Sequence, residues 1–181
     1  MNEKIIPFSY RRLADKKRAF PLFFTLVFVS ALLVLVSMSI EKYAGVVSLL
    51  AVASLTATCM VYLRYIVSDY MYSVSEGSDE NAFLIFSKVV GKKQSVMGNI
   101  PLYSILSIQK FTKEALKAYK TDKEYKRYNF APSLYPDVIY IIKANNGGQY
   151  FEILVEGSDE FSSRLTEYAN IAKLNRNSDE E

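Results

Sequence analysis

The sequence predicts an α+β membrane protein, in which two transmembrane helices are followed by a seven-stranded, bent antiparallel sheet capped by a C-terminal helix. Three observations support this prediction. Two long runs in the first third of the chain contain no charged residue. The residues after 64 alternate between apolar and polar side chains, as strands do. The last part of the chain places its apolar residues at helical spacing.

The N-terminal segment, residues 1–19, is basic. Because lysine and arginine collect on the cytoplasmic side of membrane helices, this segment is expected to lie in the cytoplasm. Basic side chains beside a membrane also attract anionic lipid headgroups. The candidates for headgroup contact are Arg11, Arg12, Lys16, Lys17 and Arg18. The alternative is that this cluster is only a signal for membrane orientation.

Residues 20–64 are predicted to form a transmembrane helical hairpin, with spans at 20–40 and 44–64. Each span is close to the ~20 residues that cross the hydrocarbon core. The turn at 41–43 has little positive charge and is expected outside, so that both termini lie in the cytoplasm and the protein is integral to the plasma membrane. A cleaved signal peptide is less favoured, since its apolar core has only about 7–15 residues. A buried soluble hairpin is also disfavoured, because neither run has a polar face.

The second span is rich in small residues, which let helices approach closely in lipid. Ala51, Ser54 and Thr58 are therefore predicted to pack against the first span or against another copy of the chain. Neither span has an ionisable residue in its interior, which argues against an ion or proton pathway. The single cysteine, Cys59, also lies in this span and has no second cysteine with which to form an internal disulfide.

The remainder is predicted to be a cytoplasmic domain at 65–174, built from extended segments that turn residues separate. The strongest turn signal is Asn146-Gly147, because a type I′ turn favours positive φ at both central positions. The seven predicted strands are residues 65–74, 82–90, 94–97, 102–111, 127–131, 138–145 and 148–155.

A charged segment at 113–127 interrupts the strand pattern. Within it, Ala115, Leu116 and Tyr119 can line up on one helical turn. Such a segment could dock on the membrane or on an acidic partner, and the plainer interpretation is a solvated insert between strands. The candidates for a partner surface are Lys113, Lys117, Lys120, Lys123, Lys126 and Arg127.

The pentapeptide EGSDE occurs twice, at 76–80 and at 156–160. The first copy lies between two predicted strands and is expected to form a hairpin loop. The second copy precedes apolar residues at helical spacing, so Ser158 is expected to be a helix N-cap with acidic residues in the first turn. Residues 175–181 are predicted to form an acidic, disordered tail.

Three stretches and the order of the elements resemble bacterial pleckstrin-homology-like (PH-like) membrane proteins, in which a two-helix transmembrane hairpin leads directly into the domain. The stretches are LRYIVSDY (63–70), NIPLYSILSI (99–108) and YNFAPSL (128–134). The resemblance covers about residues 20 to 174 and implies a PH-like domain whose last helix caps one open end of the sheet. It does not carry over phosphoinositide binding, because the loop at 76–80 that matches the family's basic loop is acidic.

The sequence offers little for catalysis. It contains no histidine and one cysteine, so the commonest general base and the ordinary zinc ligands are missing. The glycine-rich motifs that hold nucleotide phosphates are also missing. Residues 64–181 have no excess of basic side chains, which argues against a nucleic-acid partner. We therefore expect no enzymatic activity, cofactor or metal.

The sequence favours a membrane-anchored binding or scaffolding module at the cytoplasmic face, because the second span leads into the first predicted strand without a linker. The expected partners are the lipid bilayer and another membrane or cytoplasmic protein, with a homo-oligomer as a further option. The alternative function is an accessory subunit of a transporter or channel that packs through the second transmembrane helix.

Overall fold

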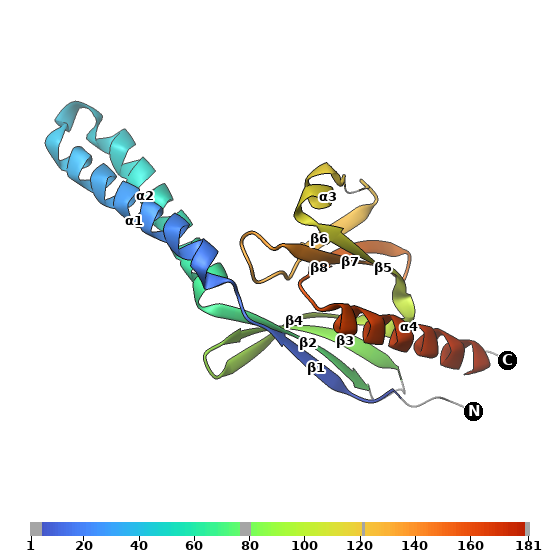
Figure 1. Ribbon diagram of the computed structural model, residues 1–181. Coiled ribbons are helices and arrows are strands. Elements are labelled where there is room, and N and C mark those ends of the chain that lie inside the picture. The colour runs from blue at the N-terminus through green and yellow to red at the C-terminus, as the bar shows by residue number, and fades with distance from the viewer. Residues whose placement is uncertain (1–4, 77–80, 121, 180–181) are drawn as a thin grey trace.

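The computed structural model describes residues 5–76, 81–120 and 122–179. It consists of a β-rich domain from which one pair of long helices projects (Figure 1). The C-terminal helix ends on the side of the domain away from the tip of this helical hairpin (Figure 1). The predicted α+β class, the two long apolar helices and the C-terminal helix are confirmed.

The first sheet contains four antiparallel strands in the order β1-β2-β3-β4. Apolar side chains alternate along its central strands, and Tyr70, Tyr72 and Val74 of β2 are buried. Gly91 makes the tight turn between β3 and β4 at a φ of 60°. The strands are β1 (Phe8–Arg12), β2 (Ser68–Glu76), β3 (Ala82–Val90) and β4 (Lys93–Pro101).

The helical hairpin is inserted between β1 and β2, so that the chain leaves the first sheet and returns to its neighbouring strand. Helix α1 spans Lys16–Ser39, a short turn spans Glu41–Tyr43, and α2 spans Ala44–Val61. A π-helical turn, Tyr62–Ile66, directly follows α2, and Val67 alone separates it from β2. These helices cover the spans predicted at 20–40 and 44–64.

Strand β1 lies outside the domain that the sequence predicted, because that domain was expected to begin at residue 65. Phe8 of β1 pairs with Val74, and Arg12 pairs with Tyr70. The ring of Tyr10 lies 5.0 Å from that of Phe161. A strand of five residues inside a basic segment shows too little alternation to be identified from the sequence. The strand that pairs with β1 also comes only after the whole helical hairpin in the chain.

The second sheet also contains four strands, in the order β5-β7-β8-β6, and β6 runs parallel to β8. The prediction of one seven-stranded antiparallel sheet is therefore wrong, because the described residues form eight strands in two sheets. The parallel pair arises because the segment between β5 and β6, which contains the short helix α3 (Lys113–Ala118), carries the chain back across the sheet, so that β6 runs in the same direction as β5 and β8. The strands are β5 (Ile105–Thr112), β6 (Tyr125–Asn129), β7 (Val138–Asn146) and β8 (Gln149–Val155).

The predicted hairpin between β7 and β8 is confirmed, but its turn is one residue later. Asn146 pairs with Gln149, and Gly147 and Gly148 form the turn with φ values of 60° and 80°. Two glycines adopt positive φ with less strain than the expected Asn146-Gly147 pair.

Helix α4 (Asp159–Asp179) packs against both sheets and closes the main core. Phe161 and Leu165 of α4 are buried there. The Ser158 hydroxyl accepts a hydrogen bond from the Phe161 backbone nitrogen at 3.1 Å, which confirms the predicted N-cap. In the first EGSDE copy, Glu76 ends β2, and residues 77–80 lie outside the described residues.

The C-terminal segment, expected to be a disordered tail from residue 175, continues α4 to Asp179. The guanidinium carbon of Arg176 lies 4.3 Å from the centre of the Tyr103 ring, a cation–π contact that favours an ordered helix here. Residues 180 and 181, the rest of that expected tail, lie outside the described residues.

A second, smaller core lies on the other face of the second sheet. It contains Ile139, Ile141 and Leu154, and Leu116 and Tyr119 pack on it. The charged segment therefore contains a helical turn, as predicted, and attaches to the domain through its apolar residues.

Candidate functional site

The outer surface of the helical hairpin is apolar and exposed. Both helices are long and apolar enough to cross a membrane, and only 11% of the most apolar window of each is buried within the molecule. A core helix of a soluble protein is mostly buried instead. An exposed apolar surface of this extent needs a cover other than water.

Small polar side chains join the two helices. Ser30 donates to the Leu26 carbonyl at 2.7 Å and therefore accepts from the Ser54 hydroxyl at 2.8 Å. Ala51 and Thr58 are buried on the same side of α2. The three residues predicted for helix packing, Ala51, Ser54 and Thr58, thus face α1, and the hairpin itself occupies this side of α2.

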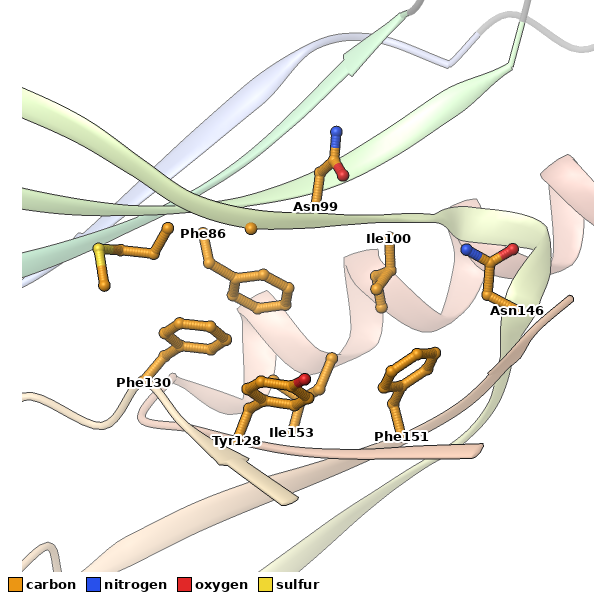
Figure 2. Close-up of a pocket in the computed structure, with 10 residues that line it drawn as sticks. Phe86, Asn99, Ile100, Tyr128, Phe130, Asn146, Phe151 and Ile153 are labelled. Atoms are coloured by element: carbon orange, nitrogen blue, oxygen red, sulfur yellow. The ribbon is translucent and has the colours of Figure 1, made fainter. Parts of the chain in front are cut away.

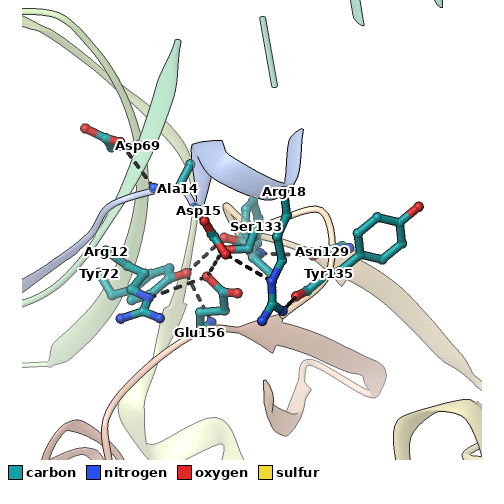
Figure 3. Close-up of polar contacts among 12 residues, drawn as sticks. Arg12, Ala14, Asp15, Arg18, Asp69, Tyr72, Asn129, Ser133, Tyr135 and Glu156 are labelled. Atoms are coloured by element: carbon teal, nitrogen blue, oxygen red, sulfur yellow. Dashed lines mark hydrogen bonds and ion pairs between the residues drawn. The ribbon is translucent and has the colours of Figure 1, made fainter. Parts of the chain in front are cut away.

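The base of the hairpin is tied to the domain by ion pairs (Figure 3). Arg11 bonds to Asp69 at the start of β2, with a nitrogen–oxygen distance of 2.8 Å. Arg18, in the first turn of α1, donates to both carboxylate oxygens of Asp137 at 2.8 and 3.1 Å and to the Tyr135 carbonyl at 2.8 Å. The hydrogen bond from Arg18 lowers the pKa of Asp137.

A buried carboxylate lies at the centre of this junction (Figure 3). Glu156, only 2% exposed, follows β8 and accepts a hydrogen bond from Ser133 at 2.9 Å. Ser133 in turn accepts from the Asp15 backbone nitrogen at 3.2 Å, and Arg12 lies 3.6 Å from the carboxylate. Burial raises the pKa of Glu156 above its ordinary value.

The hydroxyl of Tyr72 extends this network into the core. It donates to the Phe130 carbonyl at 2.9 Å and accepts from the Glu156 backbone nitrogen at 3.3 Å. A polar depression of about 220 Å³ opens beside these groups, and Arg12, Arg18 and Glu156 help to line it. Its charged groups bond to one another, so we interpret the junction as a structural clamp.

The residues predicted to contact lipid headgroups divide into two sets. Arg11, Arg12 and Arg18 form the ion pairs of the junction clamp. Lys16 and Lys17 are exposed in the first turn of α1, directly beside the apolar part of the hairpin.

The predicted partner surface is spread over α3, the following turn and β6. Lys113 lies 5.9 Å from the centre of the Tyr135 ring, and Arg127 lies 3.8 Å from a carboxylate oxygen of the buried Glu152. All six residues are exposed: Lys113, Lys117, Lys120, Lys123, Lys126 and Arg127. Lys113 and Lys117 belong to α3, Lys126 and Arg127 belong to β6, and Lys120 and Lys123 lie in the segment between these elements.

A separate apolar groove opens between the two sheets (Figure 2). Its volume is about 220 Å³. Among its lining residues, the rings of Phe86 and Phe130 stack directly on each other with their centres 4.6 Å apart, and the ring centre of Tyr128 lies 6.4 Å from that of Phe130. It is lined by Phe86, Met97, Gly98, Asn99, Ile100, Tyr128, Phe130, Asn146, Phe151 and Ile153.

Both sides of this inter-sheet groove are formed by edge strands. Within the described residues β4 pairs with β3 alone, and β6 pairs with β8 alone. A Cβ placed on Gly98 would meet no atom within 4 Å, so the groove is open above this residue. Tyr128 and Met97 at its sides are 45% and 53% exposed.

The sequence does not predict this groove. Phe86, Phe130 and Phe151 belong to segments that are far apart in the chain, and they meet only because the two sheets face each other. The one local signal was the pair Tyr128 and Phe130, two large rings on the same side of a predicted strand.

The groove is suited to apolar contact. The amide of Asn146 lies at one end and supplies a polar group (Figure 2). Across the residues that the structure describes, no group of three or more His, Cys, Asp or Glu side chains is placed to hold a metal ion.

Comparison with known proteins gave no relative: no family model, no curated protein and no solved structure matches this chain.

Proposed function

We propose that this chain is a membrane-anchored, non-catalytic binding module that holds its β domain at the cytoplasmic face of the plasma membrane. Its binding site is the inter-sheet groove. The observation that carries the proposal is the route of the chain, because the two apolar helices leave and re-enter one sheet between adjacent strands, β1 and β2.

Membrane insertion explains the exposed apolar surface of the hairpin, which lipid would cover. A removed signal sequence would not fit as well, because cleavage after α1 would take β1 away from the first sheet. The basic residues at the base of the hairpin favour a cytoplasmic position for the domain and both termini. In this orientation Lys16 and Lys17 contact lipid headgroups, while the arginines hold the clamp.

The junction clamp and the short connection from α2 to β2, a π-helical turn and one further residue, restrict the movement of the domain relative to the hairpin. Arg64 in the π-helical turn donates to the Asn129 carbonyl at 3.1 Å, which adds a tie to the end of β6. With the hairpin in the bilayer, the domain would stay against the membrane and present its groove to partners there.

The PH-like interpretation forms part of this proposal. Two facing sheets and a C-terminal helix are compatible with such a domain, and β6 would be an additional strand at the edge of its second sheet. In this interpretation the transmembrane hairpin, and not the acidic loop at 76–80, takes the place of the loop between the first two strands.

An accessory subunit that packs through Ala51, Ser54 and Thr58 is not favoured, because these residues face α1 within the hairpin.

Site-specific photo-crosslinking in living cells tests the binding function. Benzoylphenylalanine would replace Tyr128 or Met97 at the groove, and Leu106 of β5, which is 51% exposed, provides a control outside the groove lining. We expect a discrete protein adduct from the two groove positions and none from the control. Equal adducts at all three positions, or none at the groove, would contradict this function.

A further inference from the structure

We infer that the inter-sheet groove binds an extended segment of a partner protein, which inserts an apolar side chain and carries acidic residues beside it. The segment would add as a strand to the free edge of β4. This inference rests on the proposed binding function and specifies the chemistry of the partner.

The size of the groove favours a side chain over a complete small molecule. Pockets that enclose drug-sized ligands occupy about 300–1,000 Å³, whereas this one is smaller, at about 220 Å³. The rings of Phe86, Phe130 and Phe151 are among its walls, and the space above Gly98 is empty. One aromatic or branched aliphatic side chain, entering above Gly98, would suit an apolar space of this size.

The edge strands beside the groove indicate that this side chain belongs to a partner segment in extended conformation. An edge strand presents unpaired backbone N–H and C=O groups that another strand can pair with. On β4 the residues from Gln94 to Asn99 carry no charge, and Val96 and Met97 are exposed on this edge. Strand addition uses such an edge for affinity and an adjacent pocket for specificity.

The charges on the two edge strands predict acidic residues in the partner. Strands β4 and β6 contain no acidic residue, and their basic residues are Lys93, Lys126 and Arg127, of which Arg127 already lies 3.8 Å from the Glu152 carboxylate. Lys126 is exposed and stands two positions before Tyr128, on the same side of β6 as the groove. Opposite charges across an interface favour the correct partner and disfavour basic ones.

Selection from a random peptide library tests the inference. Displayed ten-residue peptides would be selected on the full-length protein in nanodiscs, in parallel with the variant Gly98→Leu, whose side chain fills the groove. We expect peptides enriched only by the native protein, with apolar residues at alternate positions and acidic residues beside them. Enrichment that is identical for Gly98→Leu, or a consensus without alternation or acidic residues, would overturn the inference.

Three measurements on the best peptide test separately the charge attraction, the strand pairing and the contact with the groove. By fluorescence anisotropy, Lys126→Glu should weaken binding at least tenfold, and Lys117→Glu on α3 should change it less than twofold. N-methylation of alternate peptide nitrogens should also weaken binding at least tenfold, because it blocks strand pairing. Tyr128→Ala should weaken binding without filling the groove, which covers the case in which Gly98→Leu fails to fold. Binding that is unaffected by these changes would contradict strand addition.

Other occupants would give different results. Self-association of the protein lost in Gly98→Leu would identify a second copy, and a co-purified lipid lost in that variant would identify an acyl chain. Either result would overturn the inference. A crosslinked partner at Tyr128 without any peptide selected through the groove would support the proposed binding function and contradict the inference of an extended acidic segment.

Discussion

At the scale of single residues, the junction between hairpin and domain depends on a carboxylate that is costly to bury. Glu156 is 2% exposed, and hydrogen bonding from Ser133 and the guanidinium of Arg12, 3.6 Å away, offset only part of its desolvation. The ion pair between Arg18 and Asp137 is more exposed. It therefore helps to orient the hairpin on the domain more than it stabilises the fold. The clamp is therefore more sensitive to changes at Glu156.

The pH dependence of stability should reflect this buried carboxylate. Because burial raises the pKa of Glu156 in the folded protein, its protonated form is favoured in the folded state relative to the unfolded state. Its contribution to stability therefore increases as the pH falls from neutral towards the ordinary glutamate pKa of about 4.3.

The variant Glu156→Gln removes this titration and leaves the other groups in place. We expect the melting temperature of the native protein, relative to that of the variant, to rise between pH 7 and pH 5. Circular dichroism melts of both proteins in the same detergent provide the measurement. A difference that is constant, or that falls on acidification, would be inconsistent with a raised pKa at Glu156.

The turn between β7 and β8 gives a second prediction at this scale. Gly147 has a φ of 60°, where a side chain is strained, so Gly147→Ala should destabilise the folded protein by about 1–2 kcal/mol. Gly98→Ala is the matched control, since its Cβ meets no atom within 4 Å, and it should change stability by less than about 0.5 kcal/mol. Equal melting temperatures for the two variants would argue against this turn.

At the scale of elements, the sequence predicts well what depends on local pattern. The two long helices, β3, the β7–β8 hairpin and the cap at Ser158 follow from uninterrupted apolar runs, alternation and turn chemistry. It fails for β1 and for the parallel pairing of β6, because both depend on partners distant in the chain. The inter-sheet groove was missed for the same reason, since its rings come from β3, β6 and β8.

The assignment of β1 to the first sheet can be tested directly. Tyr10 is partly buried against Phe161, so Tyr10→Ala should lower the free energy of unfolding by about 1–3 kcal/mol. Leu13, 61% exposed and just after β1, is the control, and Leu13→Ala should have little effect. Both values come from thermal melts in detergent. A free N-terminal segment would make the two variants equally stable.

In the whole molecule, the proposed membrane anchor and the proposed binding domain form one unit. The apolar hairpin begins and ends within a single pair of neighbouring strands, so the position of its helices fixes the position of the sheet. In the proposed orientation the turn at Glu41–Tyr43 lies outside the cell and the β domain lies inside.

Cysteine labelling in intact cells tests this arrangement most directly. In a Cys59→Ser background, single cysteines would replace Lys42 in the turn or Asp122 in the β domain, both of which are exposed. A membrane-impermeant maleimide should label the cysteine at Lys42 in intact cells and the cysteine at Asp122 only after the membrane is permeabilised. Labelling of the Asp122 position in intact cells, or recovery of the protein in the soluble fraction, would contradict a membrane-spanning hairpin with a cytoplasmic β domain.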